Sequence, residues 1–300
     1  MRYHVVDVFT SERFGGNPLA VVIDDRGLDP VVMQQIAQEF GFSETIFIAQ
    51  AVHHASQDPG DPLGVRIFTP VAELPFAGHP LVGAAFILAA ERRGGAFEDG
   101  DGPAGPVFAT RAGVVPMRLL VHAGTVTGAW LRAPQAYAEG PGPSLERVAQ
   151  CCRLLPMGLA EGPAVLASAG IPFVVVEAAG LGWLDDAAPD GRALRDLGED
   201  LGTGVLLFAR DRDDVERLHA RMFTPLVNRL EDPATGSANA ALGGYLALRS
   251  GSDVRVTVEQ GTRMGRPSVL HVQATHAQTG IVCEVGGQCV RVAEGTLDLS

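Results

Sequence analysis

Two stretches of the chain repeat one pattern. Residues 68–88 read F-T-P-V-A-E-L-P-F-A-G-H-P-L-V-G-A-A-F-I-L, and residues 223–246 read F-T-P-L-V-N-R-L-E-D-P-A-T-G-S-A-N-A-A-L-G-G-Y-L. Each opens with Phe-Thr-Pro, passes an acidic residue, crosses a turn that contains Pro and Gly, and continues as an Ala-rich apolar segment. A repeat about half a chain apart predicts two similar lobes. It also predicts one site at the seam, facing the start of both apolar segments.

Size and charge agree with two lobes and narrow the function. Three hundred residues correspond to about two domains. Apolar residues make up 46%, which is enough for real cores, and charged residues make up 19%. The net charge of -12 argues against a nucleic-acid partner, because nucleic acids require clustered Lys and Arg.

The sequence gives no sign of a membrane or of an oxidising compartment. The first residues, 1–7, lack the long apolar region of a signal peptide. The apolar stretch 74–90 contains a histidine and two prolines and is shorter than the ~20 residues that span a bilayer. The four cysteines form no C-x-x-C pair, which favours a reduced, cytoplasmic protein. They are Cys151, Cys152, Cys283 and Cys289.

The first part of the chain alternates strands with two helices. An amphipathic helix is expected at 30–40, with Pro30 in its first turn, and a helix that is apolar on nearly every side at 80–92. Residues 53–62 and 94–106 are expected to be exposed loops. Strands are expected at 3–9, 18–23, 44–50, 64–69, 107–111, 114–122 and 125–132.

The second part repeats the mixture after a segment rich in Pro, Gly and Ala at 133–143, which is the predicted linker. Helices are expected at 144–152, at 190–199 and, enclosed by other elements, at 237–248. Strands are expected at 164–168, 172–178, 204–209, 219–224, 254–258, 268–275, 280–285 and 288–293.

These elements predict an α+β protein with two pseudo-symmetric, strand-rich lobes, each wrapped around a central apolar helix. Regular β-α-β alternation and glycine-rich phosphate loops are missing from the sequence, which argues against a doubly wound sheet. We predict an N-terminal lobe over 1–122 and a C-terminal lobe over 123–300. The last strand of the chain is a candidate to return to the first lobe.

The starts of the two enclosed helices carry the chemistry that a small anion needs. His79-Pro80 and Ser237-Ala238 stand where these helices begin. The first N–H groups of a helix have no internal partner and carry partial positive charge. Glycines at 78 and 236 let a ligand approach the backbone. Taken singly, Ser237 is equally a helix cap and Gly78 a turn residue, but their repetition favours a carboxylate site.

Two carboxylates are candidates for acid/base chemistry. Glu44 starts an apolar strand, and a carboxyl buried there has the raised pKa that a general acid/base requires. An exposed edge glutamate is the plain alternative. Asp232 precedes a Pro-containing turn, where most aspartates are structural, and His79 is equally a hydrogen-bonded core histidine. No ligand spacing for a metal occurs, and no G-x-S-x-G elbow surrounds Ser237 as a hydrolase would require.

Five motifs give the chain a family resemblance. They are V-D-V-F-T-x-x-x-F-G-G-N-P at 6–18, S-E-T at 43–45, F-A-G-H-P at 76–80, E-D-P-A-T-G-S-A at 231–238 and E-Q-G-x-x-M-G-R-P-S at 259–268. Together they resemble the phenazine-biosynthesis PhzF-like family over nearly the whole chain. The resemblance implies the diaminopimelate-epimerase-like fold, with a catalytic cleft between two lobes, and a cofactor-free isomerase that is usually a homodimer.

The resemblance also implies roles for individual residues. Glu44 matches the catalytic acid/base of the family, and its supporting polar residues are matched by His79, Asp232 and Ser237. Substrate contacts are implied for Asn17, Ser43, Gly78, Gly236 and Ala238. Diaminopimelate epimerases themselves use two cysteines at the helix starts. His79 and Ser237 stand there instead, so a two-thiol racemase mechanism is disfavoured.

The residues and the resemblance together predict proton transfer on carbon in a small cyclic or unsaturated carboxylic acid, with or without an amino group. The enzyme would resemble trans-2,3-dihydro-3-hydroxyanthranilate isomerase, and no metal or cofactor would take part. Two alternatives stay open. One is an amino-acid racemase or epimerase with Glu44 and Asp232 as opposed bases, and the other is a non-catalytic carboxylate-binding protein.

Overall fold

The computed structural model describes residues 1–49, 62–91, 102, 104–225 and 230–299. The loops expected at 53–62 and 94–106 therefore lie largely outside the described residues. The contacts divide the chain into two compact units. The first unit comprises Met1–Pro134 and Gly286–Ser300, and the second comprises Gln135–Val285. None of the helices within the described ranges is long and apolar enough to cross a membrane.

The division differs from the predicted boundary after residue 122. Ala123 and Gly124 both have positive φ angles, of 50° and 70°, and form the tight hairpin turn before the next strand. That strand pairs with its predecessor over residues 117–131 and stays in the first unit. The boundary at 134/135 falls inside the segment 133–143 that was predicted as a linker.

The strands of the first unit pair into a closed ring. β1 lies between β2 and β17, β2 runs parallel to β3, and β4 pairs with β3, β5 and β6. β7 joins β6 to β8, and β8 pairs with β17. The bounds are β1 Arg2–Val8, β2 Asn17–Asp24, β3 Glu44–Ala49, β4 Leu63–Phe68, β5 Glu73–Leu74, β6 Ala104–Thr110, β7 Gly113–His122, β8 Thr125–Arg132 and β17 Gly280–Thr296.

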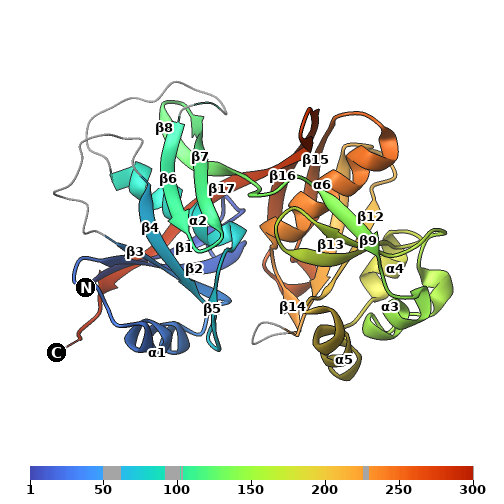
Figure 1. Ribbon diagram of the computed structural model, residues 1–300, viewed down its shortest axis with the longest axis horizontal. Helices are drawn as coiled ribbons and strands as arrows, with labels where there is room; N and C mark the ends of the chain where they lie inside the picture. The colour runs from blue at the N-terminus through green and yellow to red at the C-terminus, as the bar shows by residue number, and fades with distance from the viewer. Residues whose placement is uncertain (50–61, 92–101, 103, 226–229, 300) are drawn as a thin grey trace. The chain divides into compact units, whose positions relative to one another are not determined.

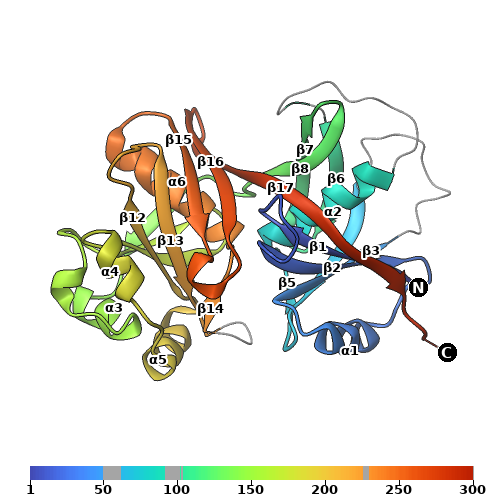
Figure 2. The same ribbon diagram turned by 180° about the vertical axis from the view of Figure 1, so that it is seen from behind.

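Helix α2, Gly78–Glu91, is the centre of this unit. It contacts β1, β2, β3, β6, β7 and β8, and its residues from Gly78 to Ile87 are all buried. Figures 1 and 2 show it among the strands. A helix without a polar face is stable only when other elements surround it, so the enclosure predicted from its sequence is confirmed.

Helix α1, Pro30–Phe40, packs on the outside of the first unit, and its bounds are those predicted. Asp29 caps its first turn by accepting a bond from the Val31 N–H, and Gly41 ends it in the left-handed region, with φ 64°. Its apolar side meets a cluster that includes Phe47 and Phe68.

The second unit repeats this plan around α6, Gly236–Ser250. Its strands pair in the order β9-β10-β11-β12-β13-β15-β16, with β14 beside β13. Helix α6 contacts β10, β11, β15 and β16. The strand bounds are β9 Ala138–Pro141, β10 Val165–Ser168, β11 Pro172–Glu177, β12 Val205–Arg210, β13 Arg217–Phe223, β14 Glu231–Asp232, β15 Val254–Gln260 and β16 Ser268–Ala277.

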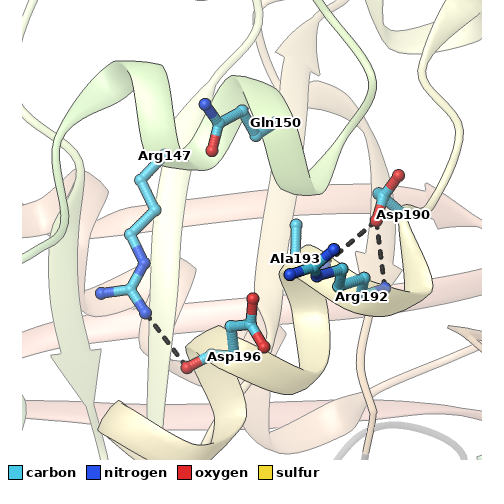
Figure 3. A pocket seen from close by; sticks show the side chains of 6 residues that line it. All are labelled: Arg147, Gln150, Asp190, Arg192, Ala193 and Asp196. Atoms are coloured by element: carbon cyan, nitrogen blue, oxygen red, sulfur yellow. Dashed lines mark hydrogen bonds between the residues drawn. The ribbon is translucent and has the colours of Figure 1, made fainter.

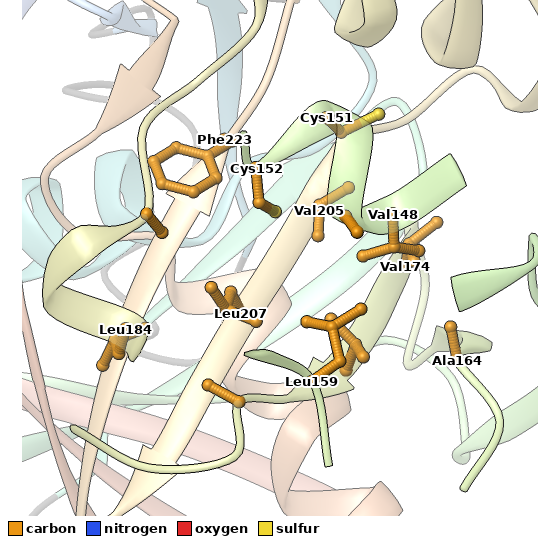
Figure 4. Close-up of a cluster of buried hydrophobic side chains, with 14 of the residues drawn as sticks. Val148, Cys151, Cys152, Leu159, Ala164, Val174, Leu184, Val205, Leu207 and Phe223 are labelled. Atoms are coloured by element: carbon orange, nitrogen blue, oxygen red, sulfur yellow. The ribbon is translucent and has the colours of Figure 1, made fainter. Parts of the chain in front are cut away.

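Three helices and a 3₁₀ turn cover the other side of the strands in this unit. They are α3 Leu145–Cys151, α4 Leu181–Asp186, α5 Gly191–Leu201 and η1 Pro156–Gly158, and a second 3₁₀ turn, η2, spans Thr262–Met264. Figure 4 shows the core between the helices and the strands, where Val205 and Leu207 of β12 meet Leu184 and Cys152. The alternate β12 residue Phe208 faces α6 instead and touches Tyr245.

One strand prediction was wrong. Two strands were expected at 280–285 and 288–293, but β17 runs unbroken through Gly286 and Gly287 between them. The glycines permit close packing. A Cβ on Gly286 would lie 2.4 Å from the Trp130 ring, and a Cβ on Gly128 would lie 2.0 Å from the Gly287 carbonyl oxygen.

We predict that Gly286→Ala destabilises the protein by about 1–3 kcal/mol, because the buried Trp130 indole would have to shift. Thermal unfolding followed by circular dichroism should show a lower midpoint. Gly140→Ala in β9 is the control, because a Cβ there meets nothing within 4 Å. Equal midpoints for the two variants would contradict the packing role of Gly286.

Candidate functional site

In the first unit, the predicted site residues come together at the start of α2. Glu44 Oε2 lies 3.4 Å from His79 Nε2, and these side chains are only 12% and 5% exposed. The Ser43 hydroxyl donates a hydrogen bond of 2.9 Å to Asn17 Oδ1, and Asn17 is fully buried at the start of β2. Gly78 is buried in the first turn of α2. Two polar contacts, Glu44–His79 and Ser43–Asn17, therefore involve adjacent residues at the start of β3.

Strand alternation directs Glu44 toward α2. Successive side chains of a strand point to opposite faces. Phe47 of β3 packs in the cluster under α1. Glu44 differs from it by an odd number of residues, so its side chain points to the other face, where α2 lies. The contact with His79 agrees with this register.

His79 is a neutral imidazole at physiological pH. Burial lowers its pKa to about 3, because desolvation penalises the charged form. Its Nε2 makes no hydrogen bond among the described residues, although Glu44 Oε2 lies within ion-pair distance. A neutral histidine beside a carboxyl can accept or donate one hydrogen bond, so it can hold a proton or a polar group of a ligand.

The loop before Asn17 is held in one conformation. Gly16 has φ 60°, and a Cβ there would lie 2.4 Å from the Val8 carbonyl oxygen. Phe9 and Phe14 also have positive φ, of 65° and 72°. The buried Asp7 carboxylate accepts a 2.6 Å bond from the Phe14 N–H. Such strain persists only where the surroundings impose it, and here it places Asn17 beside Ser43.

In the second unit, the predicted residues gather at the start of α6. The Thr235 hydroxyl donates a 2.5 Å hydrogen bond to Asp232 Oδ2 and makes no capping bond to the helix. Gly236 and Ala238 are buried, and Ser237 is partly exposed. The first turn of α6 thus keeps N–H groups that its N-cap side chain does not satisfy, as an anion site requires.

Sequence reasoning missed the polar network that fixes this helix start. Gln260 donates to the Asp232 carbonyl oxygen at 2.8 Å and accepts from Asn239 Nδ2 at 2.8 Å. Asn239 also donates to the Thr235 carbonyl oxygen at 3.0 Å. Gln260 belongs to the E-Q-G motif quoted above, and that motif was the one available signal.

The two units place different chemistry at equivalent positions. Thr45 pairs with Phe68 in the first unit, and Val205 pairs with Phe223 in the second, so Glu44 and Gly204 are equivalent. A Cβ on Gly204 would lie 2.2 Å from the Phe223 carbonyl oxygen. The second unit therefore has no room for a side chain where the first carries its carboxylate.

The carboxylate of the second unit likewise has no counterpart in the first unit. Leu74 pairs with Ile67, and Asp232 pairs with Met222. Since Phe68 and Phe223 are equivalent, Asp232 takes the place that Leu74 has in the first unit. Glu44 and Asp232 thus occupy positions of the two units that are not equivalent.

One hollow elsewhere in the second unit contains none of these residues. It has a volume of about 340 Å³ and lies between α3 and α5. Figure 3 shows that two of its charged groups have partners: Arg147 donates to the Asp196 carbonyl oxygen, and Asp190 caps α5. The part of the chain that the structure describes holds no group of His, Cys, Asp and Glu arranged for a metal ion.

Comparisons with known proteins identify the family of the chain. The family model described as "Phenazine biosynthesis-like protein" matches residues 6–295. An isomerase of Mesorhizobium japonicum is 36% identical, and trans-2,3-dihydro-3-hydroxyanthranilate isomerase of Pseudomonas aeruginosa is 34% identical. Each alignment covers 98% of both chains.

Solved structures share the fold. A Bacillus anthracis protein of the PhzF family has a TM-score of 0.83 at 25% identity, covering 100% of this chain and 99% of its own. A hydroxyproline epimerase of Agrobacterium vitis has a TM-score of 0.63 at 11% identity, covering 98% and 90%, and is similar in fold alone. The chain is an α+β isomerase that belongs to the phenazine biosynthesis-like, or PhzF, family.

Proposed function

We propose that this isomerase moves a proton between carbon atoms of a small cyclic or unsaturated carboxylic acid, with Glu44 as the acid/base. The observation that carries the proposal is the Glu44 carboxyl held 3.4 Å from a neutral His79 at the start of a buried helix. Two of the relatives are named trans-2,3-dihydro-3-hydroxyanthranilate isomerase, so trans-2,3-dihydro-3-hydroxyanthranilate is the first substrate to test.

The reaction needs no group beyond the chain itself. Glu44 removes a proton from one carbon, and the electron pair moves into the conjugated system. The same carboxyl then returns the proton at another carbon of that system. N–H donors at the helix start stabilise the negative charge that develops, each contributing about 3–4 kcal/mol. Neutral His79 holds a hydroxyl or amino group of the substrate without adding charge.

We assign the second unit to the same reaction. Gly236, Ser237 and Ala238 supply N–H groups for the substrate carboxylate, and Ser237 adds a hydroxyl. Asp232 holds a polar hydrogen of the substrate, with Thr235 fixing one of its oxygens. Asn17 and Ser43 provide polar contacts in the first unit.

A racemase or epimerase with two opposed bases is the weaker alternative. Such enzymes use two groups in matching positions, one for each face of the substrate carbon. Here the position equivalent to Glu44 is Gly204, and the position equivalent to Asp232 is Leu74. A binding protein without catalysis would not need a buried carboxyl beside a neutral histidine, so that alternative is weaker still.

Two further expectations stay predictions. The four cysteines are buried and none forms a disulfide, which supports a cytoplasmic location. The homodimer rests on the family resemblance alone, and light scattering of the purified protein would test it.

Glu44→Gln should lower kcat at least a thousandfold, because the amide cannot take up the proton, while the fold is kept. Turnover of trans-2,3-dihydro-3-hydroxyanthranilate, followed by absorbance and NMR, measures the effect. The exposed Glu216→Gln is the control. Activity of Glu44→Gln near that of the control would rule out Glu44 as the acid/base.

Reaction in heavy water separates the isomerase from the racemase. We expect deuterium at the carbon that receives the proton in an isomerised unsaturated acid, to the extent that the proton held by Glu44 exchanges with solvent before it is returned. We expect none at the α-carbon of proline, hydroxyproline or other saturated amino acids. NMR of each mixture gives the labelled position. Label at the α-carbon of a saturated amino acid, with loss of optical rotation, would instead establish a racemase.

The neutral state of His79 predicts a pH dependence of stability. Its pKa is about 3 when folded and 6.5 when unfolded, so the unfolded chain binds more protons between these values. The stabilisation is fully present above pH 6.5 and falls as the pH decreases, by up to about 1.4 kcal/mol per pH unit. Urea unfolding of the wild type and His79→Gln from pH 4 to 8 measures the difference. Parallel curves would contradict the buried neutral imidazole.

A further inference from the structure

The repeat contains two Arg–Glu pairs that the sequence pattern did not reveal. Arg66 donates from Nε and Nη2 to the two oxygens of Glu73, at 2.8 and 2.7 Å. Arg221 donates in the same way to Glu231, at 2.9 and 2.8 Å. In each pair two parallel hydrogen bonds join the guanidinium to the carboxylate, so they fix the orientation of the two groups as well as their separation.

The surroundings of the two pairs match as well. The Arg66 guanidinium lies 5.2 Å from the centre of the Phe68 ring, and that of Arg221 lies 4.9 Å from Phe223. Phe68 pairs directly with Glu73 in the ladder, as Phe223 does with Glu231. The repeated unit is therefore Arg-x-Phe-Thr-Pro followed by Glu, and it begins two residues before the stretch recognised from sequence.

Both pairs lie on the face of the strands that is turned away from the central helix. Phe68 packs in the cluster under α1, and Phe223 packs in the cluster under α5. Their paired residues Glu73 and Glu231 share those faces, so the next residues face the other side. In the second unit that next residue is Asp232. Holding Glu231 on one face therefore places Asp232 on the face of α6.

The spacing to the helices is the same in both units. Four residues lie between Glu73 and Gly78, and four lie between Glu231 and Gly236, with a proline second in each link. In the first unit, β4 also carries β3 through the pairing of Thr45 with Phe68. Glu44 is therefore linked to β4 through β3, and His79 is linked to β4 through β5. The Arg66–Glu73 pair fixes the position of β5 on β4.

We propose that Arg66–Glu73 and Arg221–Glu231 are positioning pairs, which set the location of the catalytic groups from the opposite face of the strands. Arg66–Glu73 fixes the Glu44–His79 contact, and Arg221–Glu231 fixes Asp232 and the start of α6. The inference rests on the proposed roles of Glu44, His79 and Asp232.

The two pairs differ in the further contacts around them. Arg111 adds an ion pair of 2.9 Å to Glu73, and the Ala112 N–H donates to the Pro75 carbonyl oxygen at 3.1 Å. Arg221 Nη1 donates to carbonyl oxygens at the end of α4, among them those of Leu184 and Ala187. The guanidinium fork therefore has contacts that a lysine ammonium cannot reproduce.

The test for the first unit uses Arg66→Lys and Arg66→Gln, and reads the imidazole of His79 by NMR of histidine-labelled protein. The His79 signal is assigned by its loss in His79→Gln. In the wild type it should not titrate between pH 5 and 8. We expect its chemical shift to move in Arg66→Lys, and to move further in Arg66→Gln.

The control is Arg210→Lys, which weakens the more exposed Arg210–Glu177 pair on β12 and β11. It should leave the His79 signal unchanged, as should Arg221→Lys. Arg221→Lys should instead move the side-chain amide signals of Asn239 and Gln260. If His79 keeps its wild-type shift and titration in both Arg66 variants, the positioning role of Arg66 is wrong.

Kinetics then separate this inference from the proposed function. On a substrate that the wild type converts, Arg66→Lys should lower kcat about 10- to 100-fold, the effect of a displacement near 1 Å. An inactive Glu44→Gln with normal Arg66→Lys would overturn the positioning pairs alone, whereas an active Glu44→Gln would overturn the function.

Discussion

Each unit depends on the burial of a helix that has no polar face. The central helices α2 and α6 are rich in Ala, Leu and Gly, and strands contact α2 from several directions. Such a helix gains its stability from the apolar area that the strands remove from water. Its first turn nevertheless carries N–H groups without internal partners. Burying the helix therefore brings donors without internal partners into an apolar interior, and the proposed carboxylate site rests on these donors.

The same alternation that builds the strands separates support from chemistry. Residues facing α1 or α5 are Phe, Arg and Glu, and they hold the hairpin that precedes each central helix. Residues facing the central helix are the candidates for catalysis. The Arg66–Glu73 pair can therefore be strong although neither side chain faces the central helix. The hydrogen bond from Arg66 lowers the pKa of the Glu73 carboxyl. A one-residue slip in the ladder would exchange the two roles.

The sequence was most informative where local rules decide the structure. Asp29-Pro30 and Gly41 mark both ends of α1 by capping, and the bounds agree to the residue. Gly286-Gly287 misled because glycine signals a turn as well as a close approach, and only the position of Trp130 distinguishes the two. The short helix α4 was missed because it starts at a glycine cap and has only six residues.

The candidate site shows the same limit. Asn17, Glu44, His79 and Asp232 could be named from motifs, but their partners depend on register between distant strands. Arg66 is seven residues from Glu73, and Gln260 is 28 residues from Asp232, so no local pattern links either pair. Register also gives the strongest argument on mechanism. The two units share a backbone plan, yet one holds Glu44 where the other has a glycine that a Cβ would force against a carbonyl. A two-base reaction with Glu44 and Asp232 would therefore use groups at non-equivalent positions of the duplicated fold. The proposed single base takes a proton from one carbon and gives one to another, so it needs no counterpart in the second unit.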